Sequence, residues 1–574
     1  MKGEPTPAES LLFLALGGAG EIGMNLNLYG YRNRWLMVDL GVTFADPETP
    51  GVDLIVPDIA WIADRREDLV ALVLTHAHED HLGAVAHVWR HLRCPVYATP
   101  FATAVLRRKL EEVGLEDRVP VHVYRPGDTL ELAPFRVLAV PITHSIPESQ
   151  ALAIETPLGL VVHSGDWKLD PDPLVGERTA AKALEELGAR GVLALVCDST
   201  NVFRHGESGS EAAVRNSLRT LLAGKPGRIA VTTFSSNIAR LQTLAEVAAE
   251  HGRRAALVGR SLERFTEAAR ECGYLSHLPP FLDERAAGFL PPDKVLLICT
   301  GCQGEPRGAM ARIASGEHSH VVLEAGDVAV FSAKIIPGNE RTLARVHNNL
   351  ALAGVEVVTE RDAFIHVSGH PARDELAQMY RWIKPRIAVP VHGEARHIAE
   401  HVRLAESQKV PYAMTVRNGD MLRLAPGAPT RIAEVPVGRL AVADGSLVSV
   451  QGPLMQARRR LMQHGTAMVS VALDADGMLA APARVVLLGV VEDVDGARAR
   501  AAEAAVDAAV GALPRRASAV EETVCETARV AVRRSLTQIC SRRPLIEVQL
   551  LRVGERRAGK SAARAPALDK DVAQ

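Results

Sequence analysis

The stretch Thr75-His76-Ala77-His78-Glu79-Asp80-His81 decides how this sequence is interpreted. It holds three imidazoles and a metal-binding carboxylate, and it directly follows an apolar run that predicts a buried strand. In an extended loop, alternate residues project to the same side, so His76 and His78 can face one centre. Asp80 and His81, nearer the predicted start of a helix, can face a second centre. One short segment can therefore supply ligands to two metal ions.

Three further candidate ligands follow other apolar runs, at the points where those predicted strands end. They are His144, Asp166 and His392. Gly165 and Gly393, which adjoin two of them, allow tight backbone turns. Taken alone, each of the three is more typical of a structural histidine or a turn aspartate. Together with the histidine-rich loop they form a coherent set, and imidazoles with carboxylates suit Zn²⁺ or Mn²⁺.

Size and composition are those of a globular protein with several domains. A chain of 574 residues is longer than those that fold around a single hydrophobic core. Its content of 47% hydrophobic and 23% charged residues is typical of globular proteins. The net charge of −2 means that a nucleic-acid substrate cannot be inferred from bulk charge. Seven cysteines in a chain of this length predict reduced thiols rather than a disulfide framework, and the one close pair, Cys299 and Cys302, lacks the second pair of a structural zinc site.

The sequence shows neither a secretory signal nor a membrane span. The N-terminus has no basic stretch followed by an apolar core. No apolar run reaches the roughly 20 residues that cross a bilayer. We therefore expect a cytoplasmic protein with no membrane contact.

The order of predicted elements indicates a layered α/β protein. Apolar runs alternate with helical patterns up to residue 207. From 208 to 362, longer helix–strand alternation predicts a parallel sheet. Two more strand–histidine units follow, and Ala425–Thr430 has the composition of a linker. The last domain combines strands, one of them expected at Val485–Val491, with two amphipathic helices.

These motifs also carry a resemblance to a known family. The histidine-rich loop matches the HxHxDH signature of the metallo-β-lactamase superfamily, and Asp39, His144 and Asp166 match its other motifs in order. The segment 208–362 resembles the β-CASP domain of members that process nucleic acids. Further stretches resemble the bacterial ribonuclease J family: Gly17–Gly23, Cys197–Asn201, Thr300–Pro306, Ile336–Glu340 and Val367–His370.

The resemblance implies an α/β fold: a metallo-β-lactamase αββα sandwich with an inserted β-CASP domain and a small α/β C-terminal domain. The boundaries that we expect are 1–207 and 363–430 for the two parts of the metallo-β-lactamase domain, 208–362 for the β-CASP domain, 431–449 for a linker, 450–554 for the C-terminal domain and 555–574 for a disordered tail.

The resemblance also implies a role for each candidate ligand. Two divalent metal ions per subunit, Zn²⁺ or Mn²⁺, are expected. Asp39 would orient a ligand, or alternatively cap the turn between a strand and a loop. One ion would be held by His76, His78 and His144 and the other by Asp80, His81 and His392, with Asp166 bridging the two.

His370 is the candidate for protonating the leaving oxygen. The segment Phe364–His370 predicts a strand on which His366, Ser368 and His370 share one face. The resemblance implies that His370 contacts the scissile phosphate, while the alternative is a histidine packed beneath the metal site. With Asp80 and Asp166, it completes the expected catalytic residues.

Hydroxyl-bearing residues at two predicted helix starts suggest a phosphate pocket. Helix N-termini offer free N–H groups and a positive dipole end, although the same residues would serve equally well as plain N-caps. Ser368, Gly369 and His370 would form the pocket floor. The residues at the helix starts are Ser235, Ser236, Asn237, Arg260 and Ser261.

The resemblance therefore implies a two-metal ribonuclease that hydrolyses single-stranded RNA in messenger RNA decay and ribosomal RNA maturation. It implies 5′-to-3′ exonuclease action on 5′-monophosphorylated ends, with room for endonuclease action. The alternatives are a β-CASP DNA nuclease and a non-catalytic scaffold of an RNA-degrading assembly. A scaffold would have lost ligands, and every expected ligand is present. A homodimer or higher oligomer, formed through the C-terminal domain, is also implied.

Overall fold

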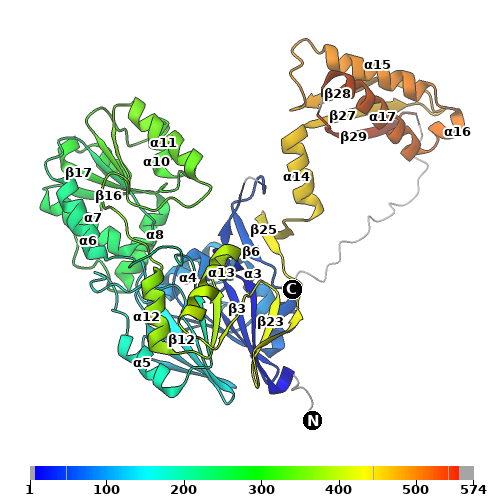
Figure 1. Ribbon diagram of the computed structural model, residues 1–574. Coiled ribbons are helices and arrows are strands. Elements are labelled where there is room, and N and C mark those ends of the chain that lie inside the picture. Colours follow the sequence, from blue (N-terminus) through cyan, green and yellow to red (C-terminus); the bar gives the residue numbers. More distant parts are fainter. Residues whose placement is uncertain (1–6, 47, 444, 541, 555–574) are drawn as a thin grey trace. The chain divides into compact units, whose positions relative to one another are not determined.

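The computed structural model of the chain describes residues 7–46, 48–443, 445–540 and 542–554 (Figure 1). Two compact units are present and are described separately. The first contains the residues up to Phe44 together with Asp53–Leu447, and the second contains Ala45–Val52 and the residues from Val448 onward. The tail expected to be disordered, 555–574, lies outside the described residues.

Two β-sheets form the centre of the first unit. Apolar side chains from both sheets, among them Phe13, Val137 and Val389, share one buried cluster. The eight-stranded sheet has the order β24 (Thr430–Glu434), β23 (Asp420–Ala425), β1 (Leu11–Gly17), β3 (Leu26–Tyr31), β4 (Arg34–Val38), β7 (Leu69–Val73), β8 (Val96–Ala98), β9 (Val121–Val123). The seven-stranded sheet has the order β10 (Thr129–Leu132), β11 (Phe135–Pro141), β12 (Gln150–Thr156), β13 (Gly159–His163), β14 (Ala194–Asp198), β20 (Ile387–Val391), β22 (Tyr412–Ala413).

Helices cover the outer face of each sheet. α3 (Val85–Leu92) and α4 (Pro100–Glu112) pack on the eight-stranded sheet. α5 (Ala181–Arg190), α12 (Arg373–Ile383) and α13 (Ala395–Ser407) pack on the seven-stranded sheet. Strands covered on both faces must be apolar throughout, which explains why every residue of β1 is buried. The resulting four layers are the predicted αββα sandwich.

A third sheet lies in the segment inserted between β14 and β20, and all its strands are parallel (Figure 1). Helices α6 (Glu211–Leu222), α7 (Ile238–Glu250) and α8 (Arg260–Glu271) pack on one face, and α10 (Ala309–Ala314) and α11 (Glu340–Leu352) on the other. This arrangement confirms the predicted parallel sheet. Its order is β16 (Arg254–Val258), β17 (Val295–Cys299), β15 (Ile229–Thr232), β18 (Val328–Phe331), β19 (Glu356–Val358).

Two expectations about local structure were wrong. The segment Phe364–His370 forms no strand. The carbonyl oxygen of Ile365 accepts hydrogen bonds from Nη1 of Arg240 at 2.9 Å and Oγ of Ser332 at 2.7 Å, so side chains replace a neighbouring strand. The stretch 431–449, expected to be a linker, also contains β25 (Arg439–Ala443), which pairs with β6 (Leu54–Pro57).

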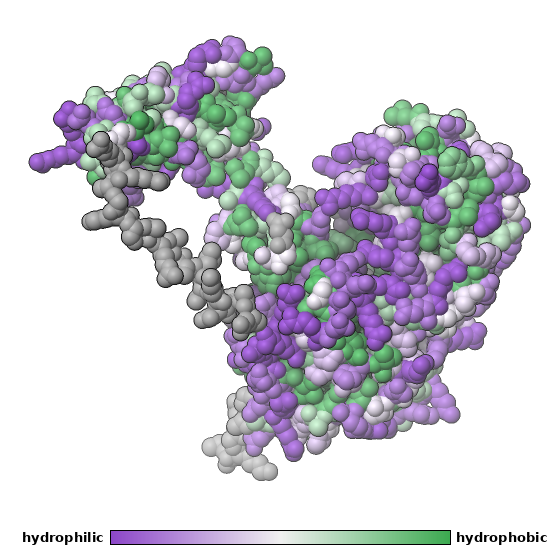
Figure 2. All heavy atoms as spheres, turned by 180° about the vertical axis from the view of Figure 1, so that it is seen from behind, coloured by the Kyte–Doolittle hydropathy of each residue, from purple (hydrophilic) through white to green (hydrophobic). Residues whose placement is uncertain are grey.

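The second unit contains a three-stranded sheet, β28 (Leu479–Leu488), β27 (Thr466–Leu473) and β29 (Leu545–Arg552), backed by α15 (Ala497–Gly511) and α17 (Glu521–Ile539). β28 begins earlier and ends earlier than the strand predicted from the sequence. Figure 2 shows hydrophobic residues among hydrophilic ones on the surface of this unit. The face of the sheet away from the helices carries half-exposed apolar side chains. They are Met468, Val486, Leu488 and Leu551.

Among the described residues, no helix is both long enough and apolar enough to cross a membrane.

Candidate metal centre

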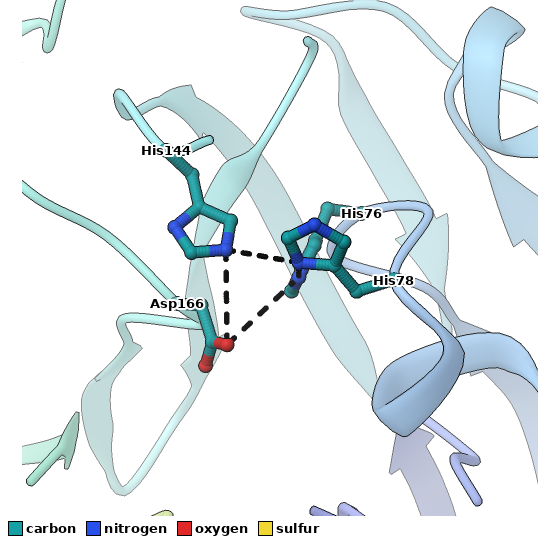
Figure 3. Close-up of side chains that lie close together, drawn as sticks. All are labelled: His76, His78, His144 and Asp166. Carbon is teal, nitrogen blue, oxygen red and sulfur yellow. Dashed lines mark hydrogen bonds and ion pairs between the residues drawn. The ribbon is translucent and has the colours of Figure 1, made fainter. Parts of the chain in front are cut away.

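Three imidazoles and one carboxylate converge at the ends of three strands of the sandwich (Figure 3). His76 and His78 lie on the loop after β7, His144 lies after β11 and Asp166 after β13. Nδ1 of His78 is 3.1 Å from Nε2 of His76 and 3.0 Å from Nε2 of His144. Oδ2 of Asp166 is 4.0 Å from the first of these Nε2 atoms and 3.9 Å from the second.

A second group converges on the same oxygen of Asp166. Its Oδ2 is 3.1 Å from Nε2 of His81 and 3.4 Å from Nε2 of His392. Oδ2 of Asp80 lies 3.7 Å and 3.6 Å from the same two nitrogens. The seven side chains therefore form two groups that share one carboxylate oxygen, which is the geometry of a site for two cations.

Hydrogen bonds on the outer side of the histidines determine which ring nitrogen faces the centre. Nδ1 of His81 donates to Oδ2 of Asp39 at 2.7 Å, and Nδ1 of His144 donates to the carbonyl oxygen of Gly369 at 2.6 Å. These oxygens can only accept, so both Nδ1 atoms carry the proton. The inward Nε2 of each ring then presents its lone pair, as a metal ligand requires.

His76 and His392 are oriented in the same way. Oγ1 of Thr75 donates to Asp39 at 2.9 Å and can therefore accept from Nδ1 of His76 at 2.9 Å. Nδ1 of His392 lies 2.9 Å from Oδ1 of Asn25, whose amide nitrogen donates to the backbone oxygen of Asp80 and lies 3.1 Å from Nε2 of His81. Four imidazoles thus turn their Nε2 atoms inward, so the donor set fits divalent cations.

Burial and neighbouring charges reinforce this arrangement. Burial holds the pKa of His76 and of His144 well below the usual value, and lowers that of His78 to about 4. His81 differs because burial, which lowers its pKa, is outweighed by the carboxylates of Asp166 and Asp39, which raise it well above the usual value. A cation in the centre would neutralise the same carboxylates.

Backbone conformation places two of these side chains. Asp39 has φ of 63° and His392 has φ of 52°, both in the left-handed region. Asp39 tolerates that region well and also accepts from the backbone N–H of Thr75 at 2.8 Å. Each residue follows a strand end, so the turn redirects its side chain toward the centre. A Cβ atom on Gly369 would lie 2.7 Å from Cε1 of His144, which leaves room only for glycine there.

His370 lies beside the two groups. Its Nδ1 is 2.8 Å from Oδ2 of Asp198 and 3.7 Å from Oδ2 of Asp166. Burial lowers the pKa of His370, but the carboxylates of Asp198 and Asp166 outweigh it and raise that pKa to about 9. Asp198 is held in turn by the N–H and hydroxyl of Thr200 at 2.8 and 2.7 Å. His370 can therefore carry a proton next to the centre.

The residues proposed to bind phosphate are only partly brought together. Oγ of Ser235 is 2.8 Å from Oγ of Ser261, which joins the two helix starts. Asn237 caps α7, because its Oδ1 accepts from the N–H of Arg240 at 2.9 Å. Ser368 instead accepts from Asn201 at 2.6 Å, next to His370. Ser236 lies half-buried before α7, and Arg260 begins α8 with an exposed side chain.

Comparisons with known proteins agree with this geometry. The profile described as "Metallo-beta-lactamase superfamily" matches residues 25–232, "Ribonuclease J, beta-CASP domain" matches 226–350, "Zn-dependent metallo-hydrolase RNA specificity domain" matches 354–414, and "Ribonuclease J C-terminal domain" matches 453–553. The ribonuclease J of Sinorhizobium meliloti is 44% identical over 553 residues, covering 95% of this chain and 98% of that protein. The chain belongs to the ribonuclease J family. The ribonuclease J of Mycolicibacterium smegmatis is 39% identical, covering 85% of this chain and 88% of that protein.

Three supporting residues of this ribonuclease J family member were not assigned a role from the sequence: Asn25, Thr75 and Asp198. Thr75 begins the histidine-rich segment and Asp198 ends an apolar strand, so the sequence indicates, though weakly, that both lie near the site. For Asn25 there is no such indication, because its partner His392 is 367 residues away along the chain. Only the paired sheets bring them together.

Replacing Asp39 by asparagine is expected to weaken metal binding by roughly 10- to 100-fold. The change keeps the shape and suits the left-handed backbone, but it removes the charge that fixes the proton on Nδ1 of His81. Competition with a coloured chelator measures the dissociation constant. The exposed Asp64→Asn variant is the matched control, and a metal affinity for Asp39→Asn equal to that of this control would contradict the role.

Proposed function

We propose that the chain is a two-metal ribonuclease that hydrolyses RNA phosphodiester bonds. The observation that carries this proposal is the convergence of six other side chains around the carboxylate of Asp166. It is made in a chain that is 44% identical to a ribonuclease J over 95% of its length. The match described as an RNA specificity domain favours RNA over the DNA nuclease alternative. The complete ligand set argues against a non-catalytic scaffold.

Two divalent ions per chain, Zn²⁺ or Mn²⁺, fit the two groups of ligands. The first ion would be held by His76, His78 and His144, and the second by Asp80, His81 and His392, with Asp166 bridging them. When bound, such ions supply Lewis acidity that activates water near neutral pH and offsets negative charge on phosphoryl oxygens.

The protein side chains supply proton transfer and orientation. His370, whose Nδ1 lies 2.8 Å from Oδ2 of Asp198, would donate a proton to the 3′ oxygen that leaves the phosphorus. Asp39, Thr75 and Asn25 orient the imidazoles through the hydrogen bonds described above. Because these contacts already exist in the folded chain, little reorganisation is needed during the reaction.

The Ser235–Ser261 pair is the proposed site for the 5′-monophosphate of the RNA. Two helix N-termini meet there, α7 after Asn237 and α8 at Arg260, and the guanidinium of Arg260 adds a positive charge. The proposed phosphate pocket also includes Ser236 and the segment Ser368-Gly369-His370. A pocket that holds the terminal phosphate would set the enzyme to remove nucleotides in the 5′-to-3′ direction, with endonuclease action as a secondary activity.

A cleavage assay on 5′-labelled, 5′-monophosphorylated RNA with Mn²⁺ or Zn²⁺ tests this function, beside DNA of the same sequence. We expect mononucleotides to be released from RNA. Internal fragments alone would contradict the 5′-phosphate pocket, preference for DNA would support the DNA nuclease alternative, and cleavage of neither would support the scaffold alternative.

The C-terminal unit is proposed to join chains into a homodimer or higher oligomer. Its sheet leaves Met468, Val486, Leu488 and Leu551 half-exposed on one face. We also propose that the enzyme works in the cytoplasm, in messenger RNA decay and ribosomal RNA maturation.

Removal of residues 450–574 is expected to convert the oligomer to a monomer and to weaken activity. The physical reason is the loss of the apolar face that would bury itself against a second copy. Light scattering measures the molar mass. A truncated chain that keeps the same number of subunits as the full chain would contradict this proposal.

A further inference from the structure

A cavity of about 630 Å³ opens beside the metal centre, in the first unit of the chain. Its volume lies within the range of roughly 300–1,000 Å³ that is usual for small-ligand sites. It is separate from the Ser235–Ser261 pair, since neither serine lines it. Six of the residues that line it carry the argument: Asn201, Phe203, Arg204, Lys334, Phe364 and His366.

The cavity shares a wall with the catalytic groups. Nδ2 of Asn201 donates to Oγ of Ser368 at 2.6 Å and to the backbone oxygen of His370 at 3.1 Å. Thr200, which also lines the cavity, donates its hydroxyl to Asp198 and to the backbone oxygen of His392. A ligand that contacts Thr200 or Asn201 in the cavity would therefore lie next to residues that hydrogen-bond to Asp198 and to the backbone of His370 and His392.

The charge of the cavity favours an anion. Arg204, Lys334 and Arg396 line it, against the carboxylate of Glu360. Arg396 is also ion-paired with Glu394 at 3.0 Å, so Arg204 and Lys334 carry most of the positive charge available to a ligand. Nζ of Lys334 is 3.4 Å from Oδ1 of Asn201, a neutral group that does not offset the positive charge, so the ammonium group can pair with an anionic ligand. Nδ1 of His366 is buried and has no hydrogen-bond partner within the described part of the chain. A buried polar atom of this kind is costly unless a ligand or water satisfies it.

Two aromatic rings stand beside these cations. Phe203 is 48% exposed and Phe364 is 49% exposed, which is unusual for phenylalanine side chains. The guanidinium of Arg396 lies 5.8 Å from the centroid of the Phe203 ring. Exposed rings next to positive charges are the combination that binds single-stranded nucleic acid, because every base can stack and every phosphate is an anion.

We propose that this cavity is a subsite for one nucleotide unit of the RNA strand adjacent to the scissile phosphate. Its phosphate would lie on Lys334 and Arg204, and its base would stack on Phe203 or Phe364. This inference rests on the proposed function and assigns a second contact with the substrate, apart from the Ser235–Ser261 pair, which does not line the cavity.

Binding of RNA by the full, metal-loaded chain tests the subsite. The probe is a short 5′-monophosphorylated RNA with phosphorothioate linkages that resist cleavage. In the double variant Arg204→Gln with Lys334→Gln, we expect the dissociation constant to rise about ten-fold. The slope of log affinity against log salt concentration should fall by roughly 0.7 for each phosphate that the variant no longer neutralises. The exposed Lys182→Gln variant, on α5, is the matched control for removal of a positive charge and should match the wild type.

Phe203→Ala separates stacking from charge. It should raise the dissociation constant about ten-fold while leaving the salt slope unchanged, because stacking releases no counterions. On cleavable RNA, both variants should raise KM and keep kcat within about two-fold, since none of these side chains is placed to transfer a proton.

Four outcomes would overturn the subsite. RNA affinity and salt slope equal to those of Lys182→Gln, with cleavage intact, would remove the subsite and leave the proposed function standing. A fall in kcat at unchanged affinity would mean that these residues only hold His370 in place. Displacement of the RNA by adenosine 5′-monophosphate from the wild type, but not from the double variant, would assign the cavity to free mononucleotide rather than to the strand. Failure of the wild type to cleave RNA would remove both proposals together.

Discussion

Asp166→Asn is expected to abolish RNA cleavage, with a fall in kcat/KM of at least about 1,000-fold. Oδ2 of Asp166 lies within 4.0 Å of imidazole nitrogens of four proposed ligands, two in each group, so Asp166 is the ligand that the two groups share. An amide in its place keeps the volume but loses the negative charge that both cations need, so both ions should bind more weakly. Metal-dependent hydrolysis would lose several kcal/mol of transition-state stabilisation.

Two measurements make this prediction specific. Metal content by mass spectrometry should fall below two ions per chain in Asp166→Asn, and circular dichroism should remain that of the wild type. Asp172→Asn, an exposed aspartate on the same loop, is the matched control and should retain both ions and activity. Wild-type activity in Asp166→Asn would show that the site cuts RNA without a shared carboxylate.

His370→Ala is expected to lower kcat by roughly 100- to 10,000-fold while both metal ions stay bound, which is the usual contribution of a general acid. His370 differs from the other histidines because its Nδ1 is committed to Asp198 at 2.8 Å, and the two carboxylates nearby hold its proton. His91→Ala, an exposed histidine on α3, is the control and should leave kcat unchanged. Loss of metal in His370→Ala would instead make His370 a ligand.

The partner of His370 predicts the pH dependence. The protonated form is the active one, so activity should decline as pH rises through the pKa of His370. That pKa is raised because the carboxylates of Asp198 and Asp166 outweigh burial. Asp198→Asn removes one of these charges, so the alkaline limb of the kcat profile should move to lower pH. If the alkaline limb does not move in Asp198→Asn, the limb reports the titration of a group other than His370.

The candidate site could be predicted from the sequence because its ligands follow strand ends. His76 and His78 lie on the loop after β7, His81 lies on the short helix α2 (Glu79–Leu82) that follows it, and His144, Asp166 and His392 each follow an apolar strand. Strands that are buried on both faces are recognisable as apolar runs, so the residues that follow them can be assigned to one edge of the sandwich. The order of domains was expected from the family resemblance, and in the structure β14 ends before the inserted segment and β20 begins after it.

The supporting contacts could not be predicted in this way. Asn25 meets His392 only because β3 and β20 lie in facing sheets, and no periodicity along the chain reports that. The segment before His370 was mistaken for a strand because side chains alternate between two sides in any extended segment. That alternation is the same whether the backbone bonds to a neighbouring strand or, as here, to the side chains of Arg240 and Ser332. The 431–449 stretch was mistaken for a linker because a short strand such as β25 depends on its partner β6 more than on its own sequence.

The most direct test of the metal centre is a titration of the chelator-stripped chain with Mn²⁺ or Zn²⁺, in which bound metal and RNA cleavage are measured on the same samples. We expect no cleavage without metal, and cleavage that rises with occupancy and levels off at two ions per chain. Full cleavage in the stripped chain, or activity that levels off at one ion, would contradict a two-metal centre.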